Sequence, residues 1–474
     1  MALIATSEKK VVIGMGATGC SVVRFLLRAG FSPVVADSRQ QPPGLDAFRE
    51  EFPEVAVETG PLNSETMLAA SEIIASPGIA LAEPALQQAV DAGIPVIGDI
   101  ELFARELAQL EQPPKVVAIT GSNGKSTVTT LVGLMAEEAG VDVRVGGNIG
   151  VPVLDLLAPL AEQKSALPQL FILELSSFQL ETTYSLAPAV ATILNLSADH
   201  MDRYASLADY HRAKQRIYRN AKQLVVNRAD PLTRGPLSRD SREWSFGLDQ
   251  PDLQQFGLRS YAGAGESGTQ EEWLVRGTEK LLPVSELAMV GKHNVANALA
   301  ALALGNAVDL PMAAMLSVLR SFKGLPHRCE RVADLDGVTF VNDSKGTNVG
   351  ATRAALDGLA TATNKIVLIA GGDGKGADFA PLAEAAEALR ALVTIGVDGD
   401  KIAQVFEGRT EIHRAESMDD AVAQARALAR CGDYVLLSPA CASFDMYRNF
   451  EARGDDFRRA VAALSGSLTA GGAE

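Results

Sequence analysis

Short apolar runs alternate with amphipathic or alanine-rich stretches along most of the chain. In the first hundred residues these runs predict strands at Lys10–Gly14, Val34–Asp37, Glu72–Ala75 and Ile94–Ile97. Further along they predict strands at Lys115–Ile119, Leu170–Leu175 and Val190–Asn195, and helices at Lys125–Ala139, 206–220 and Asn294–Leu304. Such alternation is typical of α/β domains with largely parallel sheets.

The last third of the chain continues the alternation. It predicts strands at Val338–Val341, Ile366–Ala370, Leu392–Gly396 and Tyr434–Leu437, and helical stretches at Pro381–Leu389 and Met418–Ala429. The polar segment from Gln250 to Gln270 is expected to be a surface excursion with weak β character. A chain of 474 residues exceeds one ordinary core. The chain length and the breaks near Gln112-Pro113-Pro114 and Gly324-Leu325-Pro326 indicate three domains. We expect them to cover residues 1–103, 104–324 and 325–474.

Charge and cysteine content narrow the class of protein. The formal net charge is −15, so a nucleic-acid backbone or an anionic membrane surface would be repelled. The four cysteines show no C-x-x-C pair or zinc spacing, and no apolar run approaches the length of a membrane span. We therefore expect a cytoplasmic globular protein that concentrates its lysines and arginines around anionic substrates.

The strongest chemical signal is a glycine-containing loop between a predicted strand and a predicted helix, Thr120-Gly121-Ser122-Asn123-Gly124-Lys125-Ser126-Thr127. Glycines let backbone N–H groups close around phosphate oxygens, and the helix start adds free N–H groups and the positive end of its dipole. Lys125 can reach the outer phosphates, and the Ser126 hydroxyl can hold magnesium. The usual G-x-x-x-x-G-K-[ST] pattern would place a glycine at Ile119. A simple glycine turn is the alternative.

A second glycine loop, Gly14-Met15-Gly16-Ala17-Thr18-Gly19, follows the first predicted strand and precedes a helical stretch. Asp37 lies 18 residues further on, at the end of a strand. This spacing is that of a dinucleotide-binding fingerprint, in which the carboxylate reaches a ribose hydroxyl. On these residues alone NAD is slightly favoured over another nucleotide, and a structural turn comes third.

Carboxylates and a histidine follow two predicted strands of the middle segment. Glu174 stands in an otherwise apolar strand, where a carboxylate is rarely buried unless it is paired or binds a metal. A magnesium role is favoured over a structural salt bridge. Asp199-His200-Met201-Asp202-Arg203 comes just past the next strand, at the edge where ligands bind in open α/β sheets. His200 is either a metal ligand or a hydrogen-bonded loop histidine.

Lys214 lies on the predicted helix that follows, which begins with a capping-box pattern at Ser206. It shares a partly apolar face with Tyr210, Ile217 and Tyr218 by i, i+3 and i+4 spacing. Such a lysine usually extends its ammonium into solvent. The alternative is a desolvated lysine with a lowered pKa, which can react chemically.

Three polar loops of the last segment each follow a predicted strand. They are Asn342-Asp343-Ser344-Lys345-Gly346-Thr347-Asn348, Gly371-Gly372-Asp373-Gly374-Lys375-Gly376 and Ser438-Pro439-Ala440-Cys441-Ala442-Ser443-Phe444. Three such loops at the strand ends of one sheet predict a ligand site, and two lysines there suit a dianionic small molecule. His293-Asn294-Val295-Ala296-Asn297 adds amides at a helix start, and Pro326-His327-Arg328 adds an arginine at the domain joint.

Taken together, these motifs resemble the Mur ligases of peptidoglycan synthesis, from the Gly14–Gly19 loop to Asn449-Phe450-Glu451. The T-G-S-N-G-K-S-T loop is shared with other Mur ligases and with folylpolyglutamate synthases. The stretches Asp199–Tyr204, Asn342–Asn348, Gly371–Lys375 and Ser438–Ser443 resemble the D-glutamate-adding members in particular. The resemblance implies a Rossmann-like first domain, a P-loop ATPase-like central domain with a parallel sheet, and a Rossmann-like last domain.

The resemblance replaces the NAD interpretation, because it implies that the first domain holds the uridine diphosphate of the substrate. The implied contacts to that substrate are Thr18, Asp37, Ser38, Arg39, Gly78 and Asn148; Ser38 stands where relatives can have a threonine. ATP would be bound by Gly121, Ser122, Asn123, Gly124, Lys125, Ser126, Thr127, Asn294, Asn297, Arg328 and Asp343. Two magnesium ions would be held by Ser126, Glu174, His200 and a carbamylated Lys214. D-Glutamate would be bound by Lys345, Thr347, Lys375, Ser443 and Phe444.

The implied reaction joins two anionic small molecules, UDP-N-acetylmuramoyl-L-alanine and D-glutamate, through an acyl phosphate made from ATP. The catalytic set it implies is Lys125, Glu174, His200, Lys214 and Lys345, in a monomer. The alternatives are a related Mur or folylpolyglutamate-type ligase with another acceptor, an NAD-dependent oxidoreductase based on Gly14–Asp37, and a non-catalytic nucleotide sensor. A sensor would have no use for Lys345 and Lys375.

Overall fold

The computed structural model describes residues 8–157, 167–236, 241–262, 270–289, 291–360 and 364–470. Its first sheet has five parallel strands in the order β3-β2-β1-β4-β5. The strands are β1 (Lys10–Ile13), β2 (Val34–Asp37), β3 (Ala56–Thr59), β4 (Glu72–Ala75) and β5 (Val96–Ile97). The helices that accompany them are α1 (Ala17–Arg28), α2 (Leu45–Glu51), α3 (Ser64–Leu68) and α4 (Pro84–Asp91).

The second sheet has nine strands in the order β14-β13-β12-β11-β10-β9-β6-β8-β7. It is parallel from β7 to β12, and its last strands form antiparallel pairs. The strands are β6 (Lys115–Thr120), β7 (Val143–Gly147), β8 (Leu170–Glu174), β9 (Val190–Ile193), β10 (Gln223–Asn227), β11 (Arg242–Phe246), β12 (Phe256–Ala262), β13 (Gln270–Arg276) and β14 (Glu279–Pro283). Its α-helices are α6 (Lys125–Glu138), α8 (Ser177–Glu181), α9 (Leu207–Gln215), α10 (Lys292–Ala307) and α11 (Met312–Ser321).

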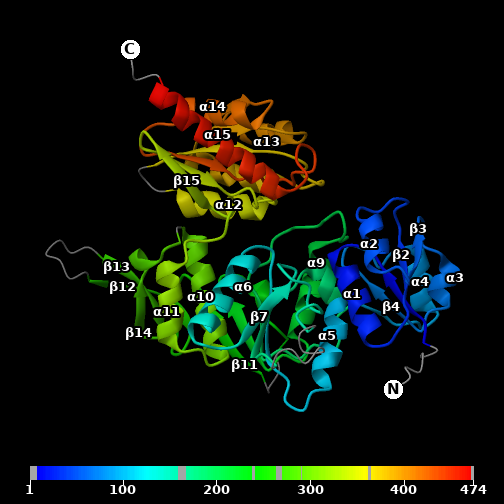
Figure 1. The fold of residues 1–474 in the computed structure, drawn as a ribbon. Coiled ribbons are helices and arrows are strands. Elements are labelled where there is room, and N and C mark those ends of the chain that lie inside the picture. The colour runs from blue at the N-terminus through cyan, green and yellow to red at the C-terminus, as the bar shows by residue number, and fades with distance from the viewer. Residues whose placement is uncertain are drawn as a thin grey trace.

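The third sheet has six strands in the order β15-β16-β20-β17-β18-β19, and β15 is its antiparallel edge. The strands are β15 (Glu330–Leu335), β16 (Val338–Asn342), β17 (Ile366–Ala370), β18 (Leu389–Thr394), β19 (Glu411–Arg414) and β20 (Tyr434–Leu437). The α-helices are α12 (Val349–Leu359), α13 (Gly399–Phe406), α14 (Met418–Leu428) and α15 (Phe450–Ala470). Figure 1 shows the third domain, in yellow to red, standing over the cyan-to-green central domain with α12 on the side that faces it.

Helix α5 (Asp99–Ala108) connects the first two domains. Phe103 of this helix packs edge-on against Phe171 of β8, with ring centroids 5.1 Å apart. Both rings belong to an apolar cluster that also contains Val12 and Ile74 of the first sheet. Residues of α5 are therefore buried against both domains, and the predicted boundary between residues 103 and 104 falls inside this helix.

The local predictions differ from the structure in detail. The predicted helical stretch Pro381–Leu389 is present as a 3₁₀-helix, Ala380–Ala388. The helix predicted over 206–220 ends at Gln215 and continues as a 3₁₀ turn, Arg216–Tyr218. The polar segment after Gln250 contains the regular strand β12, and residues 263–269 of it lie outside the described residues. Among the described helices, none has the length and apolar character of a membrane span.

Candidate active site between the central and C-terminal domains

The phosphate loop connects β6 to α6, as the sequence predicts. Gly121 and Gly124 have φ of +153° and +82°, and a Cβ atom at Gly124 would lie 2.5 Å from Oδ1 of Asn297. A side chain there would be strained by its backbone and would also collide with α10. Gly124 caps α6 without any side-chain acceptor, so the first N–H groups of the helix remain available to an anion.

Lys125 folds back over this loop. Its Nζ atom donates hydrogen bonds to the carbonyl oxygens of Gly121 at 2.8 Å and Ser122 at 2.9 Å. Burial lowers the pKa of Lys125, and the nearby carboxylates of Glu174 and Asp199 oppose that shift. The lysine is thus held at the position where phosphate oxygens would meet the loop.

The next residue, Ser126, is contacted by an arginine that follows the joint between the central and C-terminal domains. Nη2 of Arg328 donates to the Ser126 hydroxyl at 2.6 Å. Burial lowers the pKa of the Arg328 guanidinium, and Glu174 and Asp343 partly offset the effect. Arg328 lies just before the first strand of the third sheet. The structure nevertheless places its guanidinium against the phosphate loop of the central domain, where ATP is predicted to bind.

Glu174 ends β8 and is 2% exposed. Its Oε1 atom accepts from Nδ2 of Asn148 at 2.8 Å, whereas its Oε2 atom is buried without a partner. A buried carboxylate oxygen with no donor is suited to a cation. No cluster of three or more His, Cys, Asp or Glu side chains forms a metal site within the described residues. A magnesium ion here would therefore complete its shell with water, the Ser126 hydroxyl or phosphate oxygens.

His200 follows β9 and takes a left-handed backbone conformation, with φ of 57°. Its backbone N–H donates to Oδ1 of Asp199 at 3.0 Å, and its ring meets Phe178 at 4.8 Å between centroids. Burial lowers the pKa of the imidazole, and Asp199 opposes the shift. The neutral form that this favours is the one that coordinates metals.

Lys214 of α9 is 1% exposed. Its Nζ atom lies 3.0 Å from the carbonyl oxygen of Gly121, 3.3 Å from Oγ1 of Thr120 and 4.6 Å from the centroid of the Tyr210 ring. Burial, reinforced by the charge of Lys125, lowers its pKa well below the usual value. The ammonium does not extend into solvent, and a neutral amine is favoured.

Two adjoining cavities meet at the phosphate loop. The smaller, about 310 Å³, is lined by Asn294 and Asn297 of α10, by Arg328 and Asp343, and by the ring of Phe246. Burial raises the pKa of Asp343 to about 6. The predicted adenosine-side residues therefore do come together from two domains.

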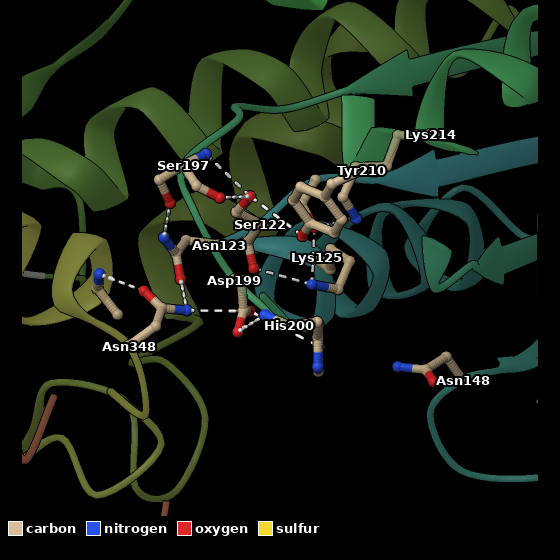
Figure 2. A network of polar contacts seen from close by, with 12 residues as sticks. Ser122, Asn123, Lys125, Asn148, Ser197, Asp199, His200, Tyr210, Lys214 and Asn348 are labelled. Atoms are coloured by element: carbon tan, nitrogen blue, oxygen red, sulfur yellow. Dashed lines mark hydrogen bonds and ion pairs between the residues drawn. The ribbon is translucent and has the colours of Figure 1, made fainter. Parts of the chain in front are cut away.

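The larger cavity, about 1170 Å³, brings together the predicted metal and substrate residues. Its wall includes Ser126, Asn148, Glu174, His200 and Lys214 from the central domain, and Lys345, Thr347 and Lys375 from the C-terminal domain. Nζ of Lys345 lies 4.0 Å above the Phe450 ring, and burial lowers the pKa of this lysine to about 8. Figure 2 shows Lys125, His200, Lys214 and Asn148 around one space.

Some predicted residues lie off the cavity wall. Ser443 and Phe444 do not line it, and Phe444 is 66% exposed, with its ring 5.6 Å from Nζ of Lys375. Phe450 and Asp199 do line the cavity, although sequence reasoning gave them no role. Phe450 could have been suspected from the Asn449-Phe450-Glu451 motif, whereas Asp199 was visible only as a neighbour of His200.

In the first domain the Asp37 carboxylate is already fully engaged. It accepts the backbone N–H of Met15 at 3.1 Å, and Arg39 donates to both of its oxygens at 2.8 and 2.7 Å. Arg39 lowers the pKa of Asp37. None of Thr18, Asp37, Ser38, Arg39 and Gly78 lines either of the two cavities.

Comparison with known proteins agrees with this arrangement. Three family descriptions match in chain order: "Mur ligase MurD-like, N-terminal domain" over residues 8–98, "Mur ligase middle domain" over 119–305 and "Mur ligase, glutamate ligase domain" over 327–441. The UDP-N-acetylmuramoylalanine–D-glutamate ligase of Pseudomonas fluorescens strain Pf0-1 is 52% identical over 98% of this chain and 100% of its own. That of Shewanella oneidensis is 50% identical over 96% of this chain and 98% of its own.

Solved structures show the same fold at lower identity. The MurF ligase from Thermotoga maritima in complex with ADP has a TM-score of 0.60 at 15% identity, over 92% of this chain and 97% of that chain. The UDP-N-acetylmuramate–alanine ligase MurC from the same organism has a TM-score of 0.57 at 20% identity, over 97% of this chain and 99% of that chain. The chain therefore belongs to the Mur ligase family, beside curated members that are UDP-N-acetylmuramoylalanine–D-glutamate ligases.

Proposed function

We propose that this Mur ligase uses ATP to join D-glutamate to UDP-N-acetylmuramoyl-L-alanine in peptidoglycan precursor synthesis. The observation that carries the proposal is the larger cavity, where the phosphate loop, Glu174 and His200 face Lys345 and Lys375. Phosphoryl transfer and an anionic amino acid can therefore meet in one space. The names of the curated relatives at about 50% identity support this choice of substrates.

The proposed reaction is consistent with the positively charged side chains that line the larger cavity. The terminal carboxylate of the UDP-linked L-alanine attacks the γ-phosphorus of ATP, the bond to ADP breaks, and an acyl phosphate forms. The amine of D-glutamate then attacks the acyl carbon, loses its proton, and phosphate leaves. Both reactants of the first step are anions, so Lys125 offsets their repulsion and stabilises the transferring phosphoryl group.

Glu174, His200 and Ser126 would hold magnesium beside the phosphates. When bound, the ion supplies positive charge to phosphate oxygens and aligns the attacking carboxylate. The unpartnered Oε2 of Glu174 supports this assignment, as does the burial of His200, which lowers the pKa of its imidazole.

Lys214 would carry a carbamate. Its neutral amine adds CO₂ and releases a proton, which exchanges a buried potential cation for an anion beside the metal position. The lowered pKa and the buried position of Lys214 support this modification.

The first domain would bind the uridine diphosphate through Thr18, the turn Asp37-Ser38-Arg39 and Gly78, with Asn148 near the muramoyl part. The Asp37 carboxylate accepts from Arg39 and Met15, so in this proposal it positions Arg39 for the diphosphate and does not itself hold a ribose hydroxyl, as a dinucleotide would require. D-Glutamate would be bound by Lys345, Thr347, Lys375, Ser443 and Phe444.

The proposed domain limits are 1–103, 104–324 and 325–474, and we expect a monomer that works in the cytoplasm.

The product itself tests the proposal. Incubation with ATP, magnesium, UDP-N-acetylmuramoyl-L-alanine and D-glutamate should give a UDP-sugar heavier by one glutamyl residue, which mass spectrometry detects. Replacing D-glutamate by L-glutamate should give little product, because inverting the α-carbon moves the amine or a carboxylate out of register. Equal product from both enantiomers, or from another amino acid in preference, would contradict the proposal.

A further inference from the structure

The side chain of Asn348 connects three segments of the active site. It is the N-cap of α12, and its Oδ1 atom accepts the backbone N–H of Ala351 at 2.8 Å. Its Nδ2 atom donates to Oδ2 of Asp199 at 3.2 Å and lies 3.4 Å from Oδ1 of Asn123. Figure 2 shows these contacts crossing from the C-terminal domain to the central domain.

Each partner of Asn348 stands beside a functional group. Asp199 fixes the His200 turn, because its Oδ1 accepts the backbone N–H of His200. Asn123 belongs to the phosphate loop, and its side chain also contacts Oγ of Ser197 at 3.4 Å. Asn348 itself directly follows Thr347 in the predicted amino-acid site. The Asn348 amide therefore connects the His200 turn, the phosphate loop and the loop that carries Lys345 and Thr347, which is called the amino-acid loop below.

The chemistry of the position selects asparagine. The residue must cap α12 with an acceptor and offer two N–H donors to the other domain. Aspartate caps as well but has no donor, and serine has a single one. Asn348 lines the larger cavity and is 9% exposed, so its contacts are better shielded from water than contacts on the open surface.

Gly350 gives independent support for a close approach at this point. A Cβ atom there would lie 2.6 Å from Oγ and 3.0 Å from Cβ of Ser197. Its backbone has no positive φ that would itself require glycine. The start of α12 is thus packed directly on the loop that precedes His200.

We propose that Asn348 is a positioning residue that holds the amino-acid loop in register with the phosphate loop and the His200 turn. In this role it acts through Asn123 and Asp199 and not through a contact of its own with ATP or amino acid. Its contacts fix how the C-terminal domain sits on the central domain, and so where Lys345 and Thr347 present the second substrate. The identity of that substrate as D-glutamate rests on the function proposed above.

The variant Asn348→Asp tests this role while keeping the helix cap. It removes both donors and places a carboxylate against Asp199. We expect kcat/KM for D-glutamate to fall about ten- to hundred-fold, as for loss of a hydrogen bond to a charged group. The matched control is Asn63→Asp, the N-cap of α3, whose Oδ1 accepts the backbone N–H of Glu65 at 2.9 Å. Its activity should stay within about twofold of wild type. Equal activities of the two variants would overturn the proposal.

Exchanging the side chains of Asn348 and Asp199 distinguishes a positioning role from a general loss of folding or activity. Asp199→Asn alone should also lower activity. The double variant Asn348→Asp with Asp199→Asn restores a donor facing an acceptor with the original net charge, so it should recover much of the loss. Strictly additive losses in the double variant would show that the two side chains do not act together and would overturn the proposal.

Small-angle X-ray scattering with ADP and magnesium gives a readout that needs no turnover. The radius of gyration of Asn348→Asp should exceed that of wild type and of Asn63→Asp, and the double variant should return to the wild-type value. Identical radii for all four proteins would contradict the proposal. If wild type made no product from D-glutamate, the proposed function would fail, yet the scattering would still decide the role of Asn348.

Discussion

Lys214 is a lysine enclosed by the phosphate loop and an aromatic ring. Its Nζ atom donates to two oxygens, Oγ1 of Thr120 and the carbonyl oxygen of Gly121. A charged amine in such a place is disfavoured, since burial opposes the ionised form. The chemical state of this one nitrogen therefore decides how much negative charge it would bring to the proposed magnesium site.

Lys214→Ala should lose most ligase activity and keep its melting temperature within a few degrees, because the cost of burying the amine is also removed. In ¹³C-bicarbonate, wild type should show a carbamate carbon by NMR that the variant lacks. Lys222→Ala, which removes an exposed lysine of the same domain, should keep both the signal and the activity. Full activity in Lys214→Ala, with no carbamate signal in wild type, would rule out the modification.

A variant of Lys375 tests whether D-glutamate binds at the C-terminal side of the larger cavity. The backbone of Lys375 is left-handed, with φ of 50°, and its exposed side chain places a cation at the cavity wall. Losing a charge-assisted hydrogen bond costs about 1.5–3 kcal/mol, so Lys375→Ala should raise the KM for D-glutamate roughly ten- to hundred-fold. The KM for ATP should change little. Lys401→Ala, which removes an exposed lysine paired with Asp398 in the same domain, is the control and should leave both constants unchanged. An unchanged D-glutamate KM in Lys375→Ala would remove this residue from the site.

At the scale of elements, the turn into α6 depends on Gly124. Gly124→Ala would combine left-handed backbone strain with a contact of 2.5 Å to Asn297, and should abolish detectable ATP binding by calorimetry. Gly140→Ala at the end of the same helix is the matched control. It has a similar φ of +72° with open space around the added atom. It should lower stability by about 1 kcal/mol and leave ATP affinity intact. Equal ATP affinity in both variants would contradict the assigned loop.

Local sequence patterns predicted the elements that carry their own boundary signals. Helix α6 was expected to begin at Lys125 and end near Ala139, and glycines bracket it in the structure. Strand β3 was missed because its Ala56–Thr59 sequence is half polar and half exposed, which leaves little apolar alternation. Contacts such as Asn348 with Asp199 join residues 149 positions apart, so periodicity along the chain contains no trace of them. Periodicity likewise gives no sign that Phe450, the first residue of α15, contacts Lys345, and only the Asn449-Phe450-Glu451 motif pointed to this residue.

At the scale of the whole molecule, the proposal assigns the UDP-linked substrate to the first sheet, ATP to the second and the amino acid to the third. The first sheet resembles a dinucleotide-binding fold, but Asp37 is occupied by Arg39. Calorimetry of the full chain should therefore show saturable binding of UDP-N-acetylmuramoyl-L-alanine and no heat with NAD or NADP. Tight NAD binding that Asp37→Ala abolishes would restore the oxidoreductase interpretation.

Phosphate release is the most direct test of the central claim that one cavity combines all three reactants. Release should be fast only when ATP, UDP-N-acetylmuramoyl-L-alanine and D-glutamate are present together with magnesium. Omitting any one should reduce it to background, since the acyl phosphate needs the first two and its turnover needs the amine. Steady phosphate release without D-glutamate, or none with the complete mixture, would contradict the account.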